Sequence, residues 1–247
     1  MEQTQIIILA AGKGTRMGGD LPKAITPLGH QTMVEYVVDT VESLETKHKP
    51  IAVIGYKADM VQAVLGDRAT YAIQDEQKGT GHAVMCAIPF IAPEIKNIVV
   101  LYADQPLVSK HTIEELVELH MSHHSKLSLA TATISDDNLF TEQFYNFGRI
   151  IRDSENHISA IVEAKDASEE EKAIREVNPA YFCCDREWMV NALSSLENNN
   201  AQGEYYLTDL VKIAFSQEIR ITSVTIHEIE ALGANTPEQL ELLSSYL

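Results

Sequence analysis

The segment LAAGKGTRMGGDLPKA, residues 9–24, combines glycines with basic side chains. Lys13, Arg16 and Lys23 lie within it, opposed only by Asp20. Glycines allow successive backbone N–H groups to turn toward one anion, and lysine and arginine add positive charge beside it. The segment therefore predicts a binding site for a phosphate-bearing ligand.

The glycine spacing excludes two common phosphate-binding motifs. The Walker pattern G-x-x-x-x-G-K-[ST] occurs nowhere in the chain. Gly12 and Gly14 match the dinucleotide pattern G-x-G-x-x-G, but Met17 takes its third glycine position and Gly18 comes one residue late. Because the third glycine permits close packing of helix on strand, the segment is a poor dinucleotide fingerprint. It is better suited to a nucleoside triphosphate.

Alternating apolar runs and amphipathic stretches in the first half predict β-α-β units and a mainly parallel sheet. Such a sheet collects ligand groups at the carboxyl ends of its strands, where Asp104 ends the run NIVVLYAD. The expected strands cover residues 5–10, 50–56, 69–74 and 97–104, and the expected helices lie near 57–65, 79–88 and 110–124.

From about residue 127 the pattern changes to short strands with polar connections, which predicts a small β-rich lid or substrate face. The expected strands of this half cover residues 127–134, 148–153, 157–163 and 179–184. Helices are expected near 185–197, from about 204, and after Thr236, which is a suitable N-cap for the last one.

Length and composition limit the function classes. The 247 residues suffice for one α/β domain with one active site. The net charge of −17 excludes a nucleic-acid surface, and no apolar stretch approaches the roughly 20 residues that a membrane span needs. Three cysteines without a C-x-x-C pair argue against a disulfide framework or a thiolate zinc site. We therefore expect a cytoplasmic protein without a secretory leader, and the sequence leaves a homo-oligomer open.

The histidines of HMSHH, residues 120–124, have helical spacing that could hold a metal ion. The motif supplies no carboxylate or cysteine partner, and it ends a helix that carries several glutamates. We therefore expect His120, His123 and His124 to form a solvated helix end rather than a metal site.

Several motifs along the chain together resemble the sugar-1-phosphate nucleotidyltransferases, and most closely the uridyltransferase domain that makes UDP-N-acetylglucosamine. They occur in the order expected for that family and cover nearly the whole chain. The motifs are LAAGKGTRM with LPKA, QDEQKGTGHAV at 74–84, YADQPL at 102–107, FGRI at 147–150, IVEAKDA at 161–167, EVNPA at 176–180, QGEYYLTD at 202–209 and GAN at 233–235.

The resemblance implies a Rossmann-like, three-layer α/β fold of the GT-A type, with a nucleotidyltransferase domain over residues 1–230. Residues 231–247 would then form a C-terminal metal-ligand loop and terminal helix. The implied reaction is Mg²⁺-dependent transfer of a uridylyl group from UTP to N-acetylglucosamine 1-phosphate, releasing pyrophosphate and giving a cell-envelope precursor. Since the hexapeptide-repeat acetyltransferase domain of bacterial members does not follow, we expect neither acetyltransferase activity nor the trimerisation which that domain provides.

The resemblance also implies roles for individual residues. Arg16 would hold the β- and γ-phosphates and Lys23 the α-phosphate, as the catalytic cations. Asp104 and Asn235 would bind Mg²⁺, a hard cation suited to oxygen ligands. The nucleotide-binding positions are Leu9, Ala10, Ala11, Gly12, Gly14, Gln74, Gly79 and Thr80. The sugar-binding positions are Ala103, Gly148, Glu163, Asn178, Tyr206 and Thr208.

Two departures from the family pattern leave the sugar open. Ala103 stands where the family usually has glycine, and Asn-Pro-Ala at 178–180 replaces the usual Asn-Thr-Gly. Pro179 also removes an N–H that could donate to a ligand. Another sugar 1-phosphate such as glucose 1-phosphate therefore remains an alternative. The sequence RMGGD at 16–20 also resembles the molybdenum-cofactor nucleotidyltransferases, and a non-catalytic sugar-nucleotide sensor that kept the fold is a further alternative.

Overall fold

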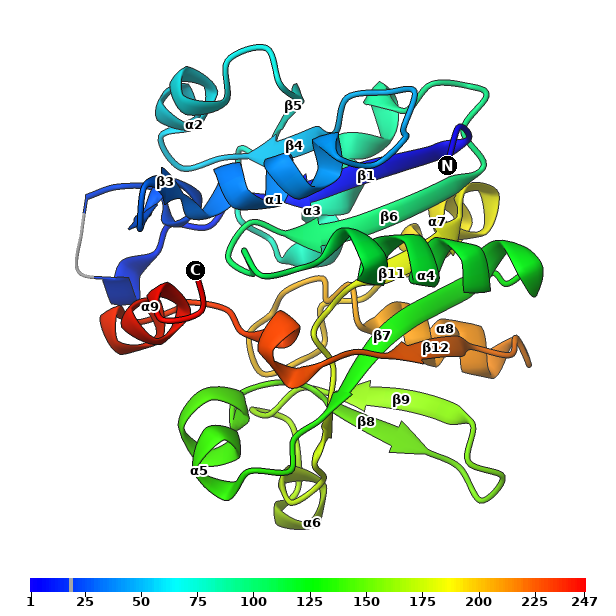
Figure 1. Ribbon diagram of the computed structural model, residues 1–247. Helices are drawn as coiled ribbons and strands as arrows, with labels where there is room; N and C mark the ends of the chain where they lie inside the picture. Colours follow the sequence, from blue (N-terminus) through cyan, green and yellow to red (C-terminus); the bar gives the residue numbers. More distant parts are fainter. Residues whose placement is uncertain (18–19) are drawn as a thin grey trace.

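The computed structural model describes residues 1–17 and 20–247, so Gly18 and Gly19 of the glycine-rich segment lie outside the described residues (Figure 1). Its strands are β1 (Thr4–Leu9), β2 (Pro27–Leu28), β3 (Gln31–Thr32), β4 (Ile51–Ile54), β5 (Thr70–Ile73), β6 (Asn97–Tyr102), β7 (Leu127–Thr133), β8 (Arg149–Arg152), β9 (Ile158–Val162), β10 (Glu176–Val177), β11 (Phe182–Asp185) and β12 (Thr222–Thr225). Its helices are α1 (Met33–Glu42), α2 (Ala58–Leu65), α3 (Thr80–Ala87), α4 (Lys110–Ser122), α5 (Asp137–Leu139), α6 (Glu169–Lys172), α7 (Arg186–Leu193), α8 (Asp209–Ser216) and α9 (Pro237–Ser244). Short helical turns are η1 (Thr15–Met17), η2 (Lys23–Ile25), η3 (Ile88–Phe90), η4 (Phe140–Phe144) and η5 (Glu228–Ala231).

One large sheet organises the described part of the chain, in the order β5-β4-β1-β6-β11-β7-β10-β8-β9, with β12 beside β7. The strands from β5 to β6 are parallel to one another, as predicted. β11 joins β6 to β7 in antiparallel fashion, and β10, β8 and β9 continue the antiparallel part. The parallel part brings the loops after β1, β4, β5 and β6 to one edge.

Helices cover both faces of the sheet and give the three layers. The side chains of β1 are buried on both faces, and alternate residues belong to different cores. Ile6 and Ile8 pack in the core that includes α1, α2 and α4, whereas Ile7 and Leu9 pack in the core that includes α3, α7 and α8. This alternation follows from the two-residue period of a strand.

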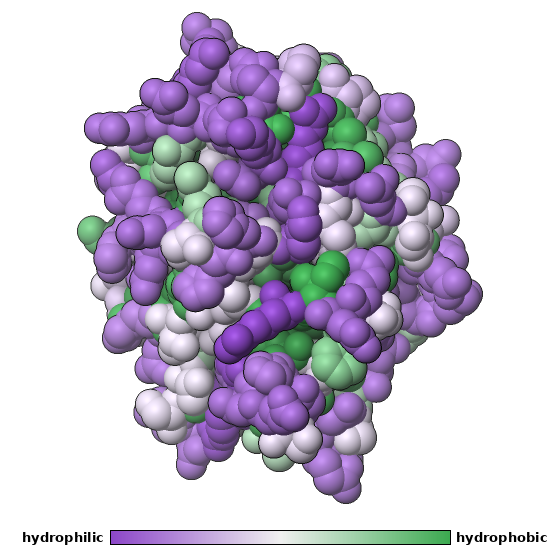
Figure 2. Space-filling model, turned by 90° about the vertical axis from the view of Figure 1, so that its right-hand side faces the viewer, coloured by the Kyte–Doolittle hydropathy of each residue, from purple (hydrophilic) through white to green (hydrophobic). Residues whose placement is uncertain are grey.

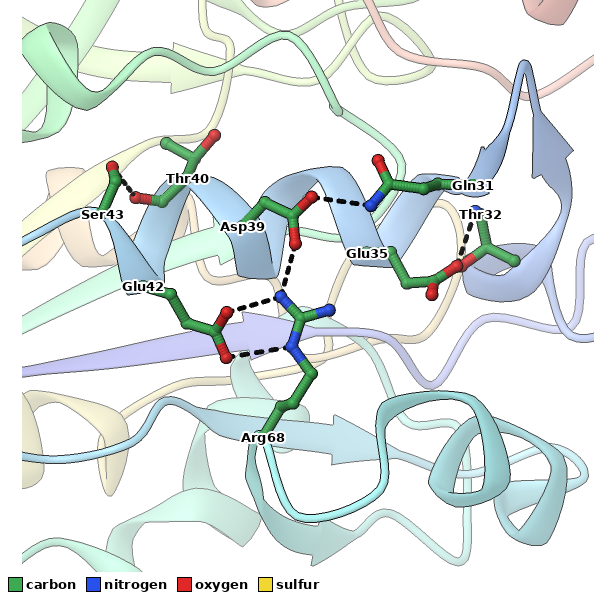
Figure 3. A network of polar contacts seen from close by, with 8 residues as sticks. All are labelled: Gln31, Thr32, Glu35, Asp39, Thr40, Glu42, Ser43 and Arg68. Carbon is green, nitrogen blue, oxygen red and sulfur yellow. Dashed lines mark hydrogen bonds and ion pairs between the residues drawn. The ribbon is translucent and has the colours of Figure 1, made fainter.

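Helix α1, which the sequence analysis did not place, begins with a capping box formed by Thr32 and Glu35. Figure 3 shows how its outer face is joined to the turn after α2. Arg68 donates to Glu42 at 2.7 and 2.9 Å, and its guanidinium also forms an ion pair with Asp39 at 2.5 Å. A two-oxygen contact of this kind fixes the orientation of both partners.

The second half forms the small β-rich region that was predicted, with β8 and β9 at the end of the large sheet and α5 and α6 near them, at the bottom of Figure 1. Several elements of this half differ from expectation: β10, β12, α5 and α6 were not predicted, and α8 begins at Asp209 rather than near residue 204. The segment before α8 is extended because Tyr205 pairs with a distant loop. Its N–H donates to Lys78 O, and its carbonyl accepts from Gly81 N, both at 2.8 Å.

The side of the molecule where β1 begins lies opposite the carboxyl ends of the parallel strands. Figure 2 shows that side, which is mainly hydrophilic with small, separate apolar patches. Among the described residues, no helix has the length and apolar character needed to cross a bilayer.

Candidate active site

The glycine-rich loop leaves β1 at the carboxyl edge of the sheet and closes on itself. Lys23 N donates to Gly12 O at 3.2 Å, and Met17 N donates to Gly14 O at 2.9 Å. Gly14 has a φ of +67°, and a Cβ there would lie 3.0 Å from the Cβ of Lys23. Glycine is therefore needed at residue 14 to bring Lys23 back over the start of the loop.

Lys23, Asp104 and Asn235 meet at this edge although they are far apart in the sequence. Lys23 Nζ donates to Asn235 Oδ1 at 2.7 Å and forms a close ion pair with Asp104 Oδ2. Arg16 Nη2 donates to the same Asn235 oxygen at 2.9 Å. The four predicted charge-handling residues therefore form one cluster.

Backbone contacts hold the two predicted metal ligands in place. Ala234 N donates to Asp104 O at 3.1 Å, and Asn235 N donates to Gln239 Oε1 of α9 at 2.7 Å. A Cβ on Gly233 would lie 3.1 Å from Asp104 O, so only a small residue lets the two loops approach this closely. In Figure 1, α9 lies beside η1, which carries Arg16.

The donor set at Asp104 and Asn235 fits a hard divalent cation. The Asp104 carboxylate and the Asn235 amide oxygen both contact one position, which the positively charged ammonium of Lys23 occupies in this structure. No group of three or more His, Cys, Asp or Glu side chains in residues 1–17 and 20–247 is arranged to hold a metal ion. A cation at this site would complete its coordination with water and substrate phosphate oxygens, as Mg²⁺ commonly does.

A cavity of about 220 Å³ lies beside this cluster and contains most of the predicted nucleotide-binding positions. Its lining includes Leu9, Ala10, Ala11, Gly12, Lys23, Gln74, Gly79, Thr80, Ala103 and Asp104. Gly14 does not line it and shapes the loop instead. Ala103, predicted as a sugar contact, lies in the wall of this cavity, where its N–H is bound by Leu9 O at 3.0 Å.

Gln74 is buried in this cavity and its amide has a defined orientation. Its Nε2 donates to Gly79 O at 3.0 Å, which leaves Oε1 as the atom able to accept from a ligand. Gly79 has a φ of +103°, and a Cβ there would lie 2.6 Å from Tyr205 O. The loop that presents Gly79 and Thr80 is therefore built against the segment before α8.

A second cavity, of about 240 Å³, adjoins the first and shares Thr80, Tyr102, Asp104 and Glu204 with it. It brings together the other predicted sugar-binding positions, Gly148, Glu163, Asn178, Tyr206 and Thr208. Thr208 Oγ1 donates to Glu163 Oε1 at 2.9 Å, and burial raises the pKa of Glu163. Asp104 thus stands at the junction of the two cavities.

The Asn-Pro-Ala sequence forms a tight turn in the wall of the second cavity. Asn178 Oδ1 accepts from Ala180 N at 2.9 Å, so the NH₂ of the Asn178 side chain is the part available to a ligand. Ala180 has a φ of +67°, in the left-handed region that glycine adopts without strain. The turn expected of a glycine at this position is therefore kept despite the alanine.

Gln77 and Gln202 are among the cavity residues that were missed at the sequence level. Gln77 Nε2 donates to Ala11 O at 2.6 Å and joins the Gln74 loop to the glycine-rich loop. Gln202 lines the second cavity, where its Nε2 donates to the Tyr206 hydroxyl at 2.8 Å and its Oε1 accepts from Lys165 Nζ at 2.5 Å. Both lie inside motifs that were recognised, QKGTG and QGEYY. Their place in these motifs was the signal that could have identified them as site residues.

The expectation for the three histidines was wrong in part. His123 and His124 are exposed, but His120 is only 2% exposed, and its Nδ1 lies 2.8 Å from Ser128 Oγ of β7. Burial lowers the pKa of His120 to about 4. The last turn of α4 faces the strands β7 and β12, so its first histidine belongs to the interior.

Comparisons with known proteins agree with this geometry. The family model described as "MobA-like NTP transferase domain" matches residues 6–201. The chain belongs to this family. It is therefore a nucleotidyltransferase, as its motifs indicated.

Curated relatives with the name bifunctional protein GlmU match almost the whole chain. The one from Thermoanaerobacter pseudethanolicus is 40% identical over 240 residues, which cover 97% of this chain and 50% of that protein. The one from Geobacillus thermodenitrificans is 43% identical over 217 residues, covering 86% of this chain and 45% of that protein. The chain thus spans about half the length of the curated relatives it matches.

Solved structures share the fold at low sequence identity. A UDP-glucose pyrophosphorylase in complex with UDP-glucose has a TM-score of 0.78 and 16% identity, with 100% of this chain and 98% of that chain covered. A putative glucose-1-phosphate thymidylyltransferase from Bacillus anthracis has a TM-score of 0.74 and 19% identity, with 98% and 94% covered. These similarities establish the three-layer nucleotidyltransferase fold of the GT-A type.

Proposed function

We propose that the protein transfers a uridylyl group from UTP to N-acetylglucosamine 1-phosphate, with Mg²⁺, to give UDP-N-acetylglucosamine and pyrophosphate. The observation that carries this proposal is the meeting of two cavities at one charged cluster. One cavity is lined by most of the predicted nucleotide-binding positions, the other by all the predicted sugar-binding positions except Ala103, and Asp104 lines both. We expect the reaction to take place in the cytoplasm.

The chemistry needs no covalent enzyme intermediate. An oxygen of the sugar 1-phosphate attacks the α-phosphorus of UTP in line, a new P–O bond forms, and the bond to the β-phosphate breaks to release pyrophosphate. Lys23 would neutralise charge on the α-phosphate, and Arg16 would hold the departing β- and γ-phosphates. Mg²⁺ bound by Asp104 and Asn235 would supply further charge neutralisation for the two anionic substrates.

The orientation of Gln74 supports uracil as the base. Because its Nε2 is bound to Gly79 O, its Oε1 faces a ligand as an acceptor. The ring N3–H of uracil can donate to that oxygen, whereas the corresponding nitrogen of cytosine carries no hydrogen. Thymine has the same edge as uracil, so this contact discriminates against CTP more than against dTTP.

The second cavity supports a sugar with several hydroxyl groups. Glu163 accepts hydrogen bonds, and the NH₂ of Asn178 donates them, so both kinds of partner are available to one ring. Thr208 orients the Glu163 carboxylate from the other side. The left-handed turn at Ala180 supports a substrate close to that of the resembled domain, although glucose 1-phosphate is the nearest alternative.

A pyrophosphate-release assay would test the proposal directly. The purified chain would be incubated with Mg²⁺, each of UTP, dTTP, CTP and GTP, and either one of a panel of sugar 1-phosphates or a molybdopterin. We expect release with UTP and N-acetylglucosamine 1-phosphate, and at least about a hundredfold less with the Asp104→Asn variant. Release only with GTP and a molybdopterin would favour the molybdenum-cofactor type instead, and sugar-nucleotide binding without release would favour a sensor.

A further inference from the structure

Arg149 is a fully buried charged residue in the FGRI motif, and none of the roles above uses it. It lies at the start of β8, directly after Gly148. Its guanidinium donates to the carbonyls of Tyr145 at 2.8 Å, Lys172 at 3.2 Å and Phe144 at 3.4 Å, and closely to that of Phe147. One side chain thus ties the turn 144–147 to the end of α6.

The environment of Arg149 compensates for its charge without a carboxylate. Within the described residues it forms no ion pair, and the rings of Phe140 and Tyr145 lie 5.0 and 5.9 Å from its guanidinium carbon. Burial lowers the pKa of Arg149. Burying a cation costs desolvation free energy unless its hydrogen bonds are satisfied, and an apolar side chain would fill the same space without that cost. What only arginine supplies here is a rigid fork of five donors for several carbonyls.

The turn held by Arg149 forms one wall of the second cavity. Asn146, Phe147 and Gly148 line that cavity together with Glu163 and Asn178. Gly148 O accepts from Asn178 N at 2.9 Å, and a Cβ on Gly148 would lie 3.6 Å from both Glu163 carboxylate oxygens. A shift of the turn would therefore displace Gly148, and with it the backbone contact of Asn178 and the space beside the Glu163 carboxylate.

We propose that Arg149 is a positioning residue for the sugar 1-phosphate, acting through the turn 144–148 and not through contact with substrate. This inference rests on the proposed function of the second cavity. The nucleotide cavity contains none of the residues of this turn. Loss of the arginine should therefore affect the sugar substrate selectively.

The test uses Arg149→Met and the milder Arg149→Lys, with Arg152→Met as the matched control. Arg152 lies on the same strand and is partly buried, whereas Arg149 is fully buried. The Arg152 guanidinium pairs with Glu176 at 2.6 and 2.8 Å and donates to Asn156 O. We expect Arg149→Met to raise KM for the sugar 1-phosphate about tenfold or more, because misplaced binding groups lose much of their effect. KM for UTP should stay within about twofold, and Arg149→Lys should be intermediate.

Hydrogen exchange provides a second readout that does not depend on turnover. In Arg149→Met, the backbone amides of residues 144–148 should exchange faster than in the wild type, while those of β1 and β6 keep their protection. The proposal is overturned if KM rises equally for both substrates, if Arg152→Met reproduces the sugar effect, or if exchange at 144–148 is unchanged. If the wild-type protein releases no pyrophosphate with any substrate pair, the proposed function fails, and the exchange measurement alone decides whether Arg149 holds the turn.

Discussion

The buried imidazole of His120 should make the stability of the fold depend on pH. His120 lies in the last turn of α4, and its Nδ1 is 2.8 Å from Ser128 Oγ, which lies 2.6 Å from Thr222 Oγ1 of β12. Burial is the main cause of its low pKa, Lys126 acts in the same direction, and Asp185 opposes them. Protonation in the folded state would place a cation among neutral hydroxyl groups.

The sign and size of the effect follow from the two pKa values. The pKa is about 4 in the folded protein and ordinarily 6.5. Because the folded state resists protonation, the contribution is fully present above pH 6.5 and is lost as the pH falls toward 4. The loss amounts to about 2 kcal/mol at pH 5 and about 3 kcal/mol once both states are protonated.

Urea unfolding of the wild type, His120→Asn and His123→Asn at pH 8 and pH 5 would measure this contribution. Many carboxylates also titrate over this range, so the comparison between proteins isolates the histidine. The wild type and His123→Asn should lose about 2 kcal/mol more stability between the two pH values than His120→Asn does, because residue 123 is exposed. An equal loss in all three proteins, or an NMR titration of His120 near pH 6.5, would refute the reasoning.

Three further outcomes follow from other contacts. Ala180→Gly should raise the free energy of unfolding by about 0.5 to 1 kcal/mol by removing strain at a φ of +67°, and a lower melting temperature would contradict this. Lys23→Met should bind Mn²⁺ about tenfold more tightly than the wild type in EPR titrations without nucleotide, since the ammonium leaves the metal position; Lys13→Met, the control, should change affinity little. Arg68→Met should lower the free energy of unfolding by about 1 kcal/mol at low salt and by less at 1 M NaCl, and a salt-independent loss would argue against the ion pairs of Figure 3.

Much of the fold could be predicted because its central strands are buried on both faces. Such strands appear in the sequence as continuous apolar runs, and NIVVLY followed by Asp104 also places a carboxylate at the carboxyl edge. The same reasoning missed α1, although Thr32 and Glu35 carry a capping-box signature before its apolar face. It also missed β12, whose four residues TSVT are too short and too polar to stand out.

The candidate site could be predicted only as a set of residues, not as an arrangement. The motifs selected Lys23, Asp104 and Asn235, but their spacing does not show that the lysine ammonium stands between the other two. The resemblance assigned Ala103 to the sugar, but Ala103 lines the first cavity together with Asp104, and only Asp104 of the two also lines the second. The motif alone does not show how neighbouring residues are divided between the two cavities.

The residues that sequence reasoning placed least well are charged or titratable side chains in the interior. His120 was expected in solvent because its neighbours in the helix are polar, and Arg149 was passed over inside a recognised motif. The partner of His120 is a serine on strand β7, and the partners of Arg149 are backbone carbonyls. Every residue carries a carbonyl, so no residue type marks the turn that receives a buried guanidinium. A charged residue type therefore does not indicate solvent exposure where the folded chain surrounds the charge with hydrogen-bond acceptors. The carbonyls that accept from Arg149 belong in part to the turn that lines the second cavity, so a buried charge can help to shape a predicted substrate site.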